Sequence, residues 1–314
     1  MRRIQDGRGL LIGLPSASPL GDVGALERGA SLLARAVARP RDGGEAVDDP
    51  ELGSLWLKGG PLRRHAAWRH GLAWRVLLRL PPRLRECSGV RELSAAGLEC
   101  LEPVLAAARF EGGRCTGQAL ALRREEEAIP FATVLRGLGA LERLQHTRAL
   151  AVAVAALHGA GVDHRDLYLR NALVVRRGAQ RRVVLIDHWR GVRRDGGTGL
   201  RPIGTGLRPL GSRLRPLAAA RAARGLGQIL VEAPRDLTPD EVLELLGQYF
   251  AHRNIDPLGP TGSAMLHDAA MWRVREQRRL GDRGDSGAEV PAEFHLDRTA
   301  IAQRASALER SVEP

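Results

Sequence analysis

The chain has 314 residues, 44% of them hydrophobic and only 4% aromatic, which predicts one large domain or two lobes with a core of Leu, Val and Ala. Its formal net charge of +12 favours anionic partners, namely nucleic acid, phosphorylated sugars or an anionic membrane face. An Arg-rich composition without functional meaning would give the same charge, since Lys58 is the only lysine. Three cysteines without a C-x-x-C pair argue against a disulfide framework or a zinc site and favour a reducing cytoplasm. No stretch approaches the roughly 20 apolar residues of a membrane span.

The first half of the chain alternates turn-rich stretches with short apolar runs. Residues 1–50 are rich in Gly, Arg and Asp and show no strong period. Apolar spacing that stops at Gly97 predicts a helix from Leu84 to Ala96. A glycine turn at 111–113 separates two apolar runs, as in a hairpin. The strands expected in this half are 36–38, 55–58, 98–108 and 117–122.

The second half opens with the strongest helical pattern of the chain, from Leu138 to Leu157, which Gly159 ends. Residues 197–217 repeat a heptapeptide three times with a proline in each copy. Those prolines exclude a heptad coiled coil and indicate a basic low-complexity insert. We further expect strands at 172–175 and 183–187, helices at 219–232 and 238–250, an irregular stretch at 252–296 and a polar helix at 297–312.

Three polar residues follow the long helix at spacings typical of phosphoryl-transfer enzymes. Asp166 lies in the loop before a predicted hairpin, and Asn171 follows five residues later, as in the pattern H-R-D-x-x-x-x-N. Asp187 ends an apolar strand, a position that suits a magnesium ligand. Phosphoryl transfer needs a carboxylate beside the acceptor hydroxyl, metal ligands and a cation on the nucleotide. A lone His-Arg-Asp is a common accident in an Arg-rich chain, but the ordered set predicts Asp166 as catalytic and Asn171 and Asp187 as metal ligands.

Two upstream residues complete the candidate site. Lys58 ends the run Leu55-Trp56-Leu57, and Glu86 lies near the start of the next predicted helix. A Lys–Glu ion pair of this kind orients the ammonium group toward nucleotide phosphates, so both residues are predicted to bind ATP. Taken alone, they could equally be a surface lysine and a surface glutamate. His164 is expected to brace the loop rather than to catalyse. No G-x-G-x-x-G precedes Lys58, so no phosphate-covering loop is assigned.

With these residues in place, the chain resembles the lipopolysaccharide kinase family, which includes the heptose kinases, the Kdo kinases and InaA-like proteins. Tyr168 stands two residues after Asp166, where generic protein kinases carry Lys or Arg, and this favours a sugar-type acceptor. Many heptose-kinase-like members carry His at the position of Asn171. The matching segments are 55–58 with the basic stretch to 83, Arg85-Glu86 to Gly97-Leu98, His158 to Tyr168, Leu185 to Arg190, and 225–241.

The resemblance implies an α+β, two-lobed protein-kinase-like fold with a small β-rich N-lobe and a larger helical C-lobe. It also implies how the chain is divided. A diverged N-terminal segment that starts the N-lobe is expected at 1–49, the N-lobe at 50–126, the C-lobe with its insert 197–217 at 127–250, and a C-terminal tail at 251–314.

The function that the resemblance implies is ATP- and magnesium-dependent phosphorylation of a heptose or Kdo hydroxyl of lipopolysaccharide core. The expected location is the cytoplasm, with peripheral contact to anionic lipid at the inner face of the inner membrane. Neither nucleic acid nor a stable protein partner is expected. One alternative is a kinase that acts on protein or another small molecule, which Tyr168 and the absence of an Ala-Pro-Glu motif disfavour. Another is a non-catalytic pseudokinase or anion-binding module. The net charge favours this alternative, whereas the complete set of acidic residues in the candidate site disfavours it.

Overall fold

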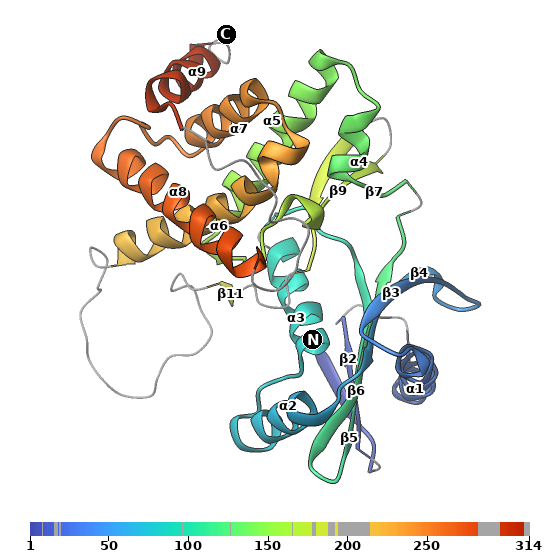
Figure 1. The fold of residues 1–314 in the computed structure, drawn as a ribbon. Coiled ribbons are helices and arrows are strands. Elements are labelled where there is room, and N and C mark those ends of the chain that lie inside the picture. The colour runs from blue at the N-terminus through green and yellow to red at the C-terminus, as the bar shows by residue number, and fades with distance from the viewer. Residues whose placement is uncertain are drawn as a thin grey trace. The chain divides into compact units, whose positions relative to one another are not determined.

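The chain forms two compact units in a computed structural model (Figure 1). The first comprises Met1–Ala128 together with Asp187, and the second comprises Ile129–Ile186 and the later part of the chain. The structure describes residues 1–7, 9–15, 18, 20–95, 97–125, 127–164, 166–177, 180–187, 192–193, 214–281 and 296–310. Arg165, His188 to Arg190 and most of the insert expected at 197–217 lie outside these residues.

The N-terminal unit is built on a six-stranded sheet with the order β1-β2-β5-β6-β4-β3, in which every neighbouring pair is antiparallel. Three helices accompany the sheet. The elements are β1 (Arg2–Gln5), β2 (Leu10–Leu14), α1 (Asp22–Ala38), β3 (Gly43–Asp49), β4 (Gly53–Pro61), α2 (Arg64–Leu77), α3 (Pro82–Ala95), β5 (Pro103–Glu111) and β6 (Arg114–Arg123).

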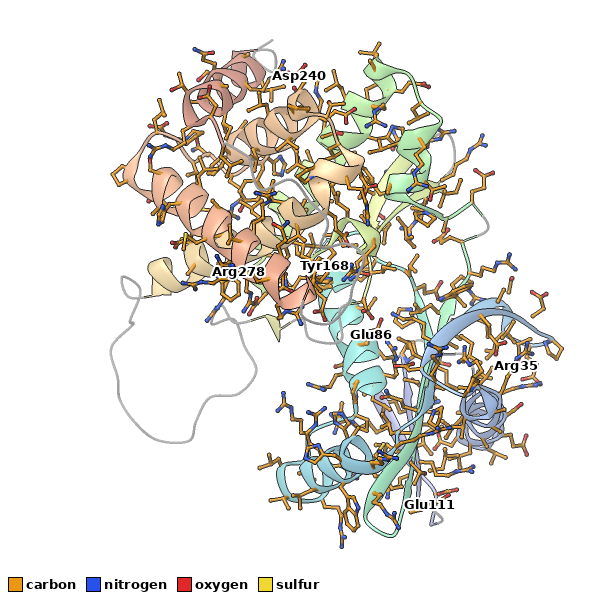
Figure 2. All side chains as sticks on the ribbon, in the orientation of Figure 1. Arg35, Glu86, Glu111, Tyr168, Asp240 and Arg278 are labelled. Atoms are coloured by element: carbon orange, nitrogen blue, oxygen red, sulfur yellow. The ribbon has the colours of Figure 1, made fainter. Side chains whose placement is uncertain are left out.

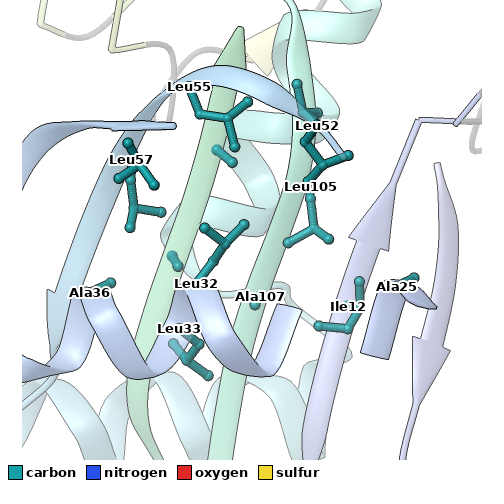
Figure 3. Packing of buried hydrophobic residues seen from close by; sticks show 14 of the residues in the cluster. Ile12, Ala25, Leu32, Leu33, Ala36, Leu52, Leu55, Leu57, Leu105 and Ala107 are labelled. Atoms are coloured by element: carbon teal, nitrogen blue, oxygen red, sulfur yellow. The ribbon is translucent and has the colours of Figure 1, made fainter. Parts of the chain in front are cut away.

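One face of this sheet packs against α1 and forms the core of the unit (Figure 3). Leu32 and Leu33 of α1 lie against Leu55 and Leu57 of β4, and all four side chains are buried. Side chains of a strand alternate between its two faces, so Trp56 and Lys58 must lie on the face opposite α1. The core thereby decides which face of the sheet Lys58 occupies.

The opposite face of the sheet carries α2 and α3 (Figure 1). Pro82 opens α3, a position where the missing amide hydrogen costs nothing. The buried side chain of Gln118 on β6 accepts a hydrogen bond from the backbone amide of Arg83 at 3.2 Å. This bond satisfies one of the amides that a helix start leaves without an internal partner, and it ties the first turn of α3 to the sheet.

The second unit combines two small sheets with helices. Its three-stranded sheet has the order β10-β9-β7, and β8 pairs with β11. The elements are β7 (Ile129–Pro130), α4 (Phe131–Arg136), α5 (Ala140–Gly159), β8 (Val162–Asp163), η1 (Leu169–Asn171), β9 (Ala172–Arg177), β10 (Gln180–Leu185), β11 (Val192–Arg193), α6 (Leu214–Asp236), α7 (Pro239–His252), α8 (Pro260–Gly281) and α9 (Arg298–Arg310).

The α+β class with a β-rich N-terminal unit and a helical C-terminal unit is confirmed. Two local expectations are wrong, and the strand expected at 98–108 begins only at Pro103. Residues 36–38 end α1 instead of forming a strand, because Leu32, Leu33 and Ala36 share the helix face that packs on the sheet. The stretch 252–296 is not irregular, because α8 occupies Pro260–Gly281. The division into parts at 49, 126 and 250 stays a prediction.

Among the described residues, no helix combines the length and the apolar character that crossing a membrane requires.

Candidate active site

The lysine predicted to bind ATP lies on β4, an inner strand of the N-terminal sheet. Lys58 is opposite Leu120 of β6 on one side and Gly44 of β3 on the other. The next residue, Gly59, has a φ of 138°, and a Cβ atom there would lie 2.2 Å from the carbonyl oxygen of Gln118. Only glycine fits this conformation and this space, so the backbone just after Lys58 can approach β6 closely.

Lys58 forms an ion pair with Glu86 of α3, labelled in Figure 2, with 2.7 Å between Nζ and Oε1. The Glu86 side chain is almost fully buried, so its charge requires a close cationic partner. The sheet face that the β4 alternation assigns to Lys58 is the face on which α3 packs. The structure therefore contains the Lys–Glu pair that the sequence suggested.

Asp187 also contacts Lys58. We call Lys58, Glu86, Asp187 and Arg83 the ionic cluster. Its Oδ1 atom lies 2.9 Å from Nζ of Lys58 and 3.4 Å from Nη1 of Arg83. Asp187 also has a φ of 69°, in the left-handed region that non-glycine residues rarely adopt, although aspartate tolerates it better than most. Unusual backbone of this kind gathers at functional sites, where the surrounding structure holds it in place.

Arg83 is the member of the ionic cluster that the sequence did not reveal. Its Nη1 atom lies 2.7 Å from Oε2 of Glu86, and its Nη2 atom lies 2.9 Å from Oδ2 of Asp42. Burial alone would lower the pKa of Arg83, but the negative charges of Glu86, Asp42 and Asp187 outweigh it and raise the pKa. A signal was available, since Arg83 precedes Glu86 by three residues, the spacing that brings side chains together on a helix. The helix was expected to start one residue too late to include it.

In the second unit, the loop after β8 carries the predicted catalytic residue. The His164 ring is buried and donates from Nε2 to the backbone carbonyl of Ile186 at 3.0 Å. Its Nδ1 accepts a hydrogen bond from the amide of Asp166 at 3.3 Å. His164 thus ties the loop to the residue that precedes Asp187 in the chain. Its expected role as a brace is confirmed.

Asn171 closes the same loop. Its side-chain nitrogen donates to the backbone carbonyl of Asp166 at 2.7 Å, and its own backbone carbonyl accepts from the amide of Ile186 at 2.8 Å. Because this contact uses the amide nitrogen, the amide oxygen is the atom suited to a metal. The structure thereby brings Asp166 and Asn171 together around one loop.

Side chains of helix α6 hold the backbone of this loop by hydrogen bonds. The buried side chains of Gln228 and Glu232 accept hydrogen bonds from the amides of Leu167 and Arg170, at 3.1 and 3.0 Å. The two α6 residues are four positions apart, so they lie on one side of the helix. Gly225, one turn earlier, gives room to His158 of α5 and to the loop, because a Cβ there would lie 2.6 Å from Nε2 of His158 and 3.0 Å from the Leu167 side chain. The sequence placed this helix correctly but gave no sign of these contacts.

Tyr168 lies within the helical unit and is buried (Figure 2). Its hydroxyl donates to Glu276 of α8 and accepts from Arg279 at 3.0 Å. Burial, followed by the negative charge and hydrogen bond of Glu276, raises the pKa of Tyr168 to about 12, so the hydroxyl stays protonated at neutral pH. The tyrosine therefore links the loop to α8, the helix that the sequence analysis missed.

The residues predicted to bind magnesium have suitable chemistry. Asn171 supplies an amide oxygen and Asp187 a carboxylate, the hard oxygen ligands that Mg²⁺ prefers beside substrate phosphates. No group of three His, Cys, Asp or Glu side chains among the described residues is placed to hold a metal. The assignments of Lys58, Glu86, Asp166, Asn171 and Asp187 to ATP, catalysis and metal stay predictions.

Two comparisons with known proteins show a family likeness and a fold likeness. The lipopolysaccharide kinase (Kdo/WaaP) family matches residues 62–214, a range that begins after Lys58. A solved structure described as WaaP in complex with acyl carrier protein aligns with 86% of this chain and 98% of its own, with 18% identity and a TM-score of 0.51. That likeness confirms the kinase-like fold. No curated protein matches the chain.

The matched family consists of kinases, which confirms the predicted enzyme class, a phosphotransferase. Residues 62–214, just under half of the chain, thus match the lipopolysaccharide kinase (Kdo/WaaP) family, the family that the sequence resembles.

Proposed function

We propose that the protein is an ATP- and magnesium-dependent kinase that phosphorylates a heptose or Kdo hydroxyl of lipopolysaccharide core. The observation that carries this proposal is the ionic cluster, in which the one lysine of the chain contacts both Glu86 and Asp187. A buried glutamate that holds a lysine in one orientation is the arrangement that presents an ammonium group to nucleotide phosphates. The family match supports the acceptor class.

Each residue has a defined role in this proposal. Lys58, oriented by Glu86, neutralises phosphate charge of the nucleotide. Asp166 accepts a hydrogen bond from the acceptor hydroxyl and takes up its proton as the hydroxyl oxygen bonds to the γ-phosphorus of ATP and the bond from that phosphorus to the leaving ADP breaks. Asn171 and Asp187 supply oxygen ligands, and bound magnesium would neutralise charge on the phosphates. His164 and Gln228 hold the loop of Asp166 in one conformation.

Glycines beside Lys58 are our candidates for the segment that covers the phosphates. Gly43 and Gly44 of β3 lie opposite Gly59 and Lys58 of β4, and β3 is the edge strand of the sheet. A Cβ at Gly43 would meet no atom within 4 Å, so phosphate oxygens could approach the backbone there. Close approach of backbone to phosphate is the usual reason for glycine at such a place.

The decisive experiment is phosphate transfer from ATP to purified core oligosaccharide by the wild type and by Asp166→Ala. Loss of a general base typically slows catalysis by about 10²- to 10⁴-fold, and we expect a decrease in that range. Asp240→Asn is the matched control, because it removes an exposed carboxylate of the same unit. Unchanged transfer by Asp166→Ala would refute the catalytic assignment. Transfer to protein and none to sugar would favour the alternative kinase class.

A further inference from the structure

Helix α2 presents an apolar surface that the site does not use. Its outward side chains are Trp68, Leu72 and Val76, and Leu77 and Leu78 continue this surface at the helix end. These five side chains are between 54% and 71% exposed. Positions four apart recur on one side of a helix, so the first three form a stripe, which with Leu77 and Leu78 we call the α2 face. Contiguous exposed apolar residues of this kind mark a surface that contacts something else.

The α2 face is held rigidly, because the other side of the helix is fitted to the sheet. A Cβ at Gly71 would lie 2.1 Å from the carbonyl oxygen of Gly113, so glycine lets the helix sit directly on the turn between β5 and β6. Trp74 stacks on Phe110 of β5, with ring centroids 5.9 Å apart. The opposite side of α2 is therefore packed on the sheet, and the stripe is exposed although the helix is well packed.

The charged residues of the segment that carries the α2 face are all basic. No Asp or Glu occurs between Leu52 and Arg85. The guanidinium group of Arg114 also lies over the Trp68 ring, with Cζ 5.1 Å from its centroid. Exposed arginines border the stripe on α2 and at its two ends: Arg63, Arg64, Arg69, Arg75 and Arg79.

We propose that the α2 face docks on an anionic lipid surface, with the apolar stripe at the headgroup–acyl boundary and the arginines on lipid phosphates. A helix with a Trp/Leu side bordered by arginines is the pattern of helices that lie in a membrane interface. A second copy of the chain fits poorly, because a symmetric contact would place arginines against arginines. Nucleic acid would satisfy the arginines but would leave Leu72 and Val76 in water.

The proposal rests on the proposed function and extends it. The acceptor, lipopolysaccharide core, is attached to lipid, so an enzyme that docks on the bilayer is concentrated where its substrate lies. Each arginine close to an anionic surface adds about 1 kcal/mol of attraction, which corresponds to about fivefold in affinity. Several arginines and a partly inserted stripe together are enough for reversible binding without a membrane span.

The test is co-sedimentation with vesicles of phosphatidylcholine mixed with phosphatidylglycerol, and with vesicles of phosphatidylcholine alone. We expect the wild type to bind the anionic vesicles and Leu72→Glu/Val76→Glu to bind them at least about tenfold more weakly. The matched control is Leu141→Glu/Leu258→Glu, which makes the same chemical change at exposed leucines of the helical unit and should bind like the wild type. Arg69→Gln and Arg75→Gln should each weaken binding about fivefold.

Activity assays separate this proposal from the proposed function. Transfer to delipidated core oligosaccharide should be the same for the wild type and for Leu72→Glu/Val76→Glu, whereas transfer to lipopolysaccharide in vesicles should fall with vesicle binding. Vesicle binding by a wild type that phosphorylates neither substrate would refute the proposed function and leave the docking surface standing. Equal vesicle binding by the double variant, or no binding by the wild type, would overturn the docking proposal. Self-association that the double variant abolishes would also overturn it.

Discussion

At the scale of single residues, the burial of Glu86 explains why this carboxylate has two cationic partners in the ionic cluster. Glu86 is almost fully buried and accepts from Lys58 through one oxygen and from Arg83 through the other. A buried carboxylate without cations would be strongly destabilising, so the second cation has structural value even when Lys58 is engaged elsewhere. We infer that Arg83 keeps Glu86 charged and fixed, which leaves Lys58 available to exchange Asp187 for phosphate oxygens.

Replacing Arg83 tests whether this residue, rather than Lys58, stabilises the buried charge of Glu86. Arg83→Met leaves Glu86 buried with one cation fewer, and we expect the free energy of unfolding to fall by about 3 kcal/mol. Urea unfolding followed by circular dichroism measures this change. Arg35→Met is the control, because Arg35 and Glu45 form a more exposed ion pair that should contribute about 1 kcal/mol or less. Equal effects of the two substitutions would show that Arg83 has no special role.

At the scale of elements, α6 decides the geometry of the catalytic loop. Gln228 and Glu232 hold the loop backbone, and Gly225 makes room for it. None of these residues carries out chemistry in the proposed function. They position Asp166 by satisfying amides that a buried loop would otherwise leave unpaired. A helix far along the sequence is thus part of the site.

Gln228→Ala is the variant that reports on this support. It removes the acceptor for the Leu167 amide, and small displacements of a catalytic group reduce turnover steeply. We expect kcat to fall about tenfold while the KM for ATP changes little, because Lys58 and Glu86 are untouched. Steady-state kinetics of phosphate transfer will separate the two parameters. Gln303→Ala on α9, at an exposed position, serves as the control. A change in KM alone would contradict a positioning role.

Periodicity explains which elements the sequence could predict. The helix at 138–157, the hairpin around 111–113 and the strand at 55–58 have strong local patterns, and the structure contains all three with small shifts in their ends. Helix α1 was missed although its buried residues, among them Ala25, Leu32 and Ala36, recur at helical spacing, so its pattern was present in the sequence. Helix α8 was missed for a different reason, since its buried residues include Arg273 and Glu276, which a sequence pattern assigns to solvent.

At the scale of the whole molecule, the candidate site depends on residues that are far apart in the sequence. Lys58, Glu86 and Asp187 meet although 129 positions separate the first from the last. The order of the phosphoryl-transfer residues along the chain made them predictable, and the resemblance to a family supported them. Arg83, Gln228 and Glu232 could not be assigned in this way, since their contacts depend on how helices pack and not on a motif.

Ligand-dependent stability is the property of the whole molecule that tests the proposal most directly. A ligand that binds only the folded state raises the free energy of unfolding by RT ln(1 + [L]/Kd), about 2.7 kcal/mol at a concentration of 100 Kd. We expect ATP with magnesium to raise the melting temperature and ATP with a chelator to raise it much less, because the proposed metal ligands then have no ion to hold. Lys58→Met should abolish both shifts. Arg109→Met, at an exposed position on the same sheet, should keep them. A shift that Lys58→Met retains would place the nucleotide elsewhere on the protein.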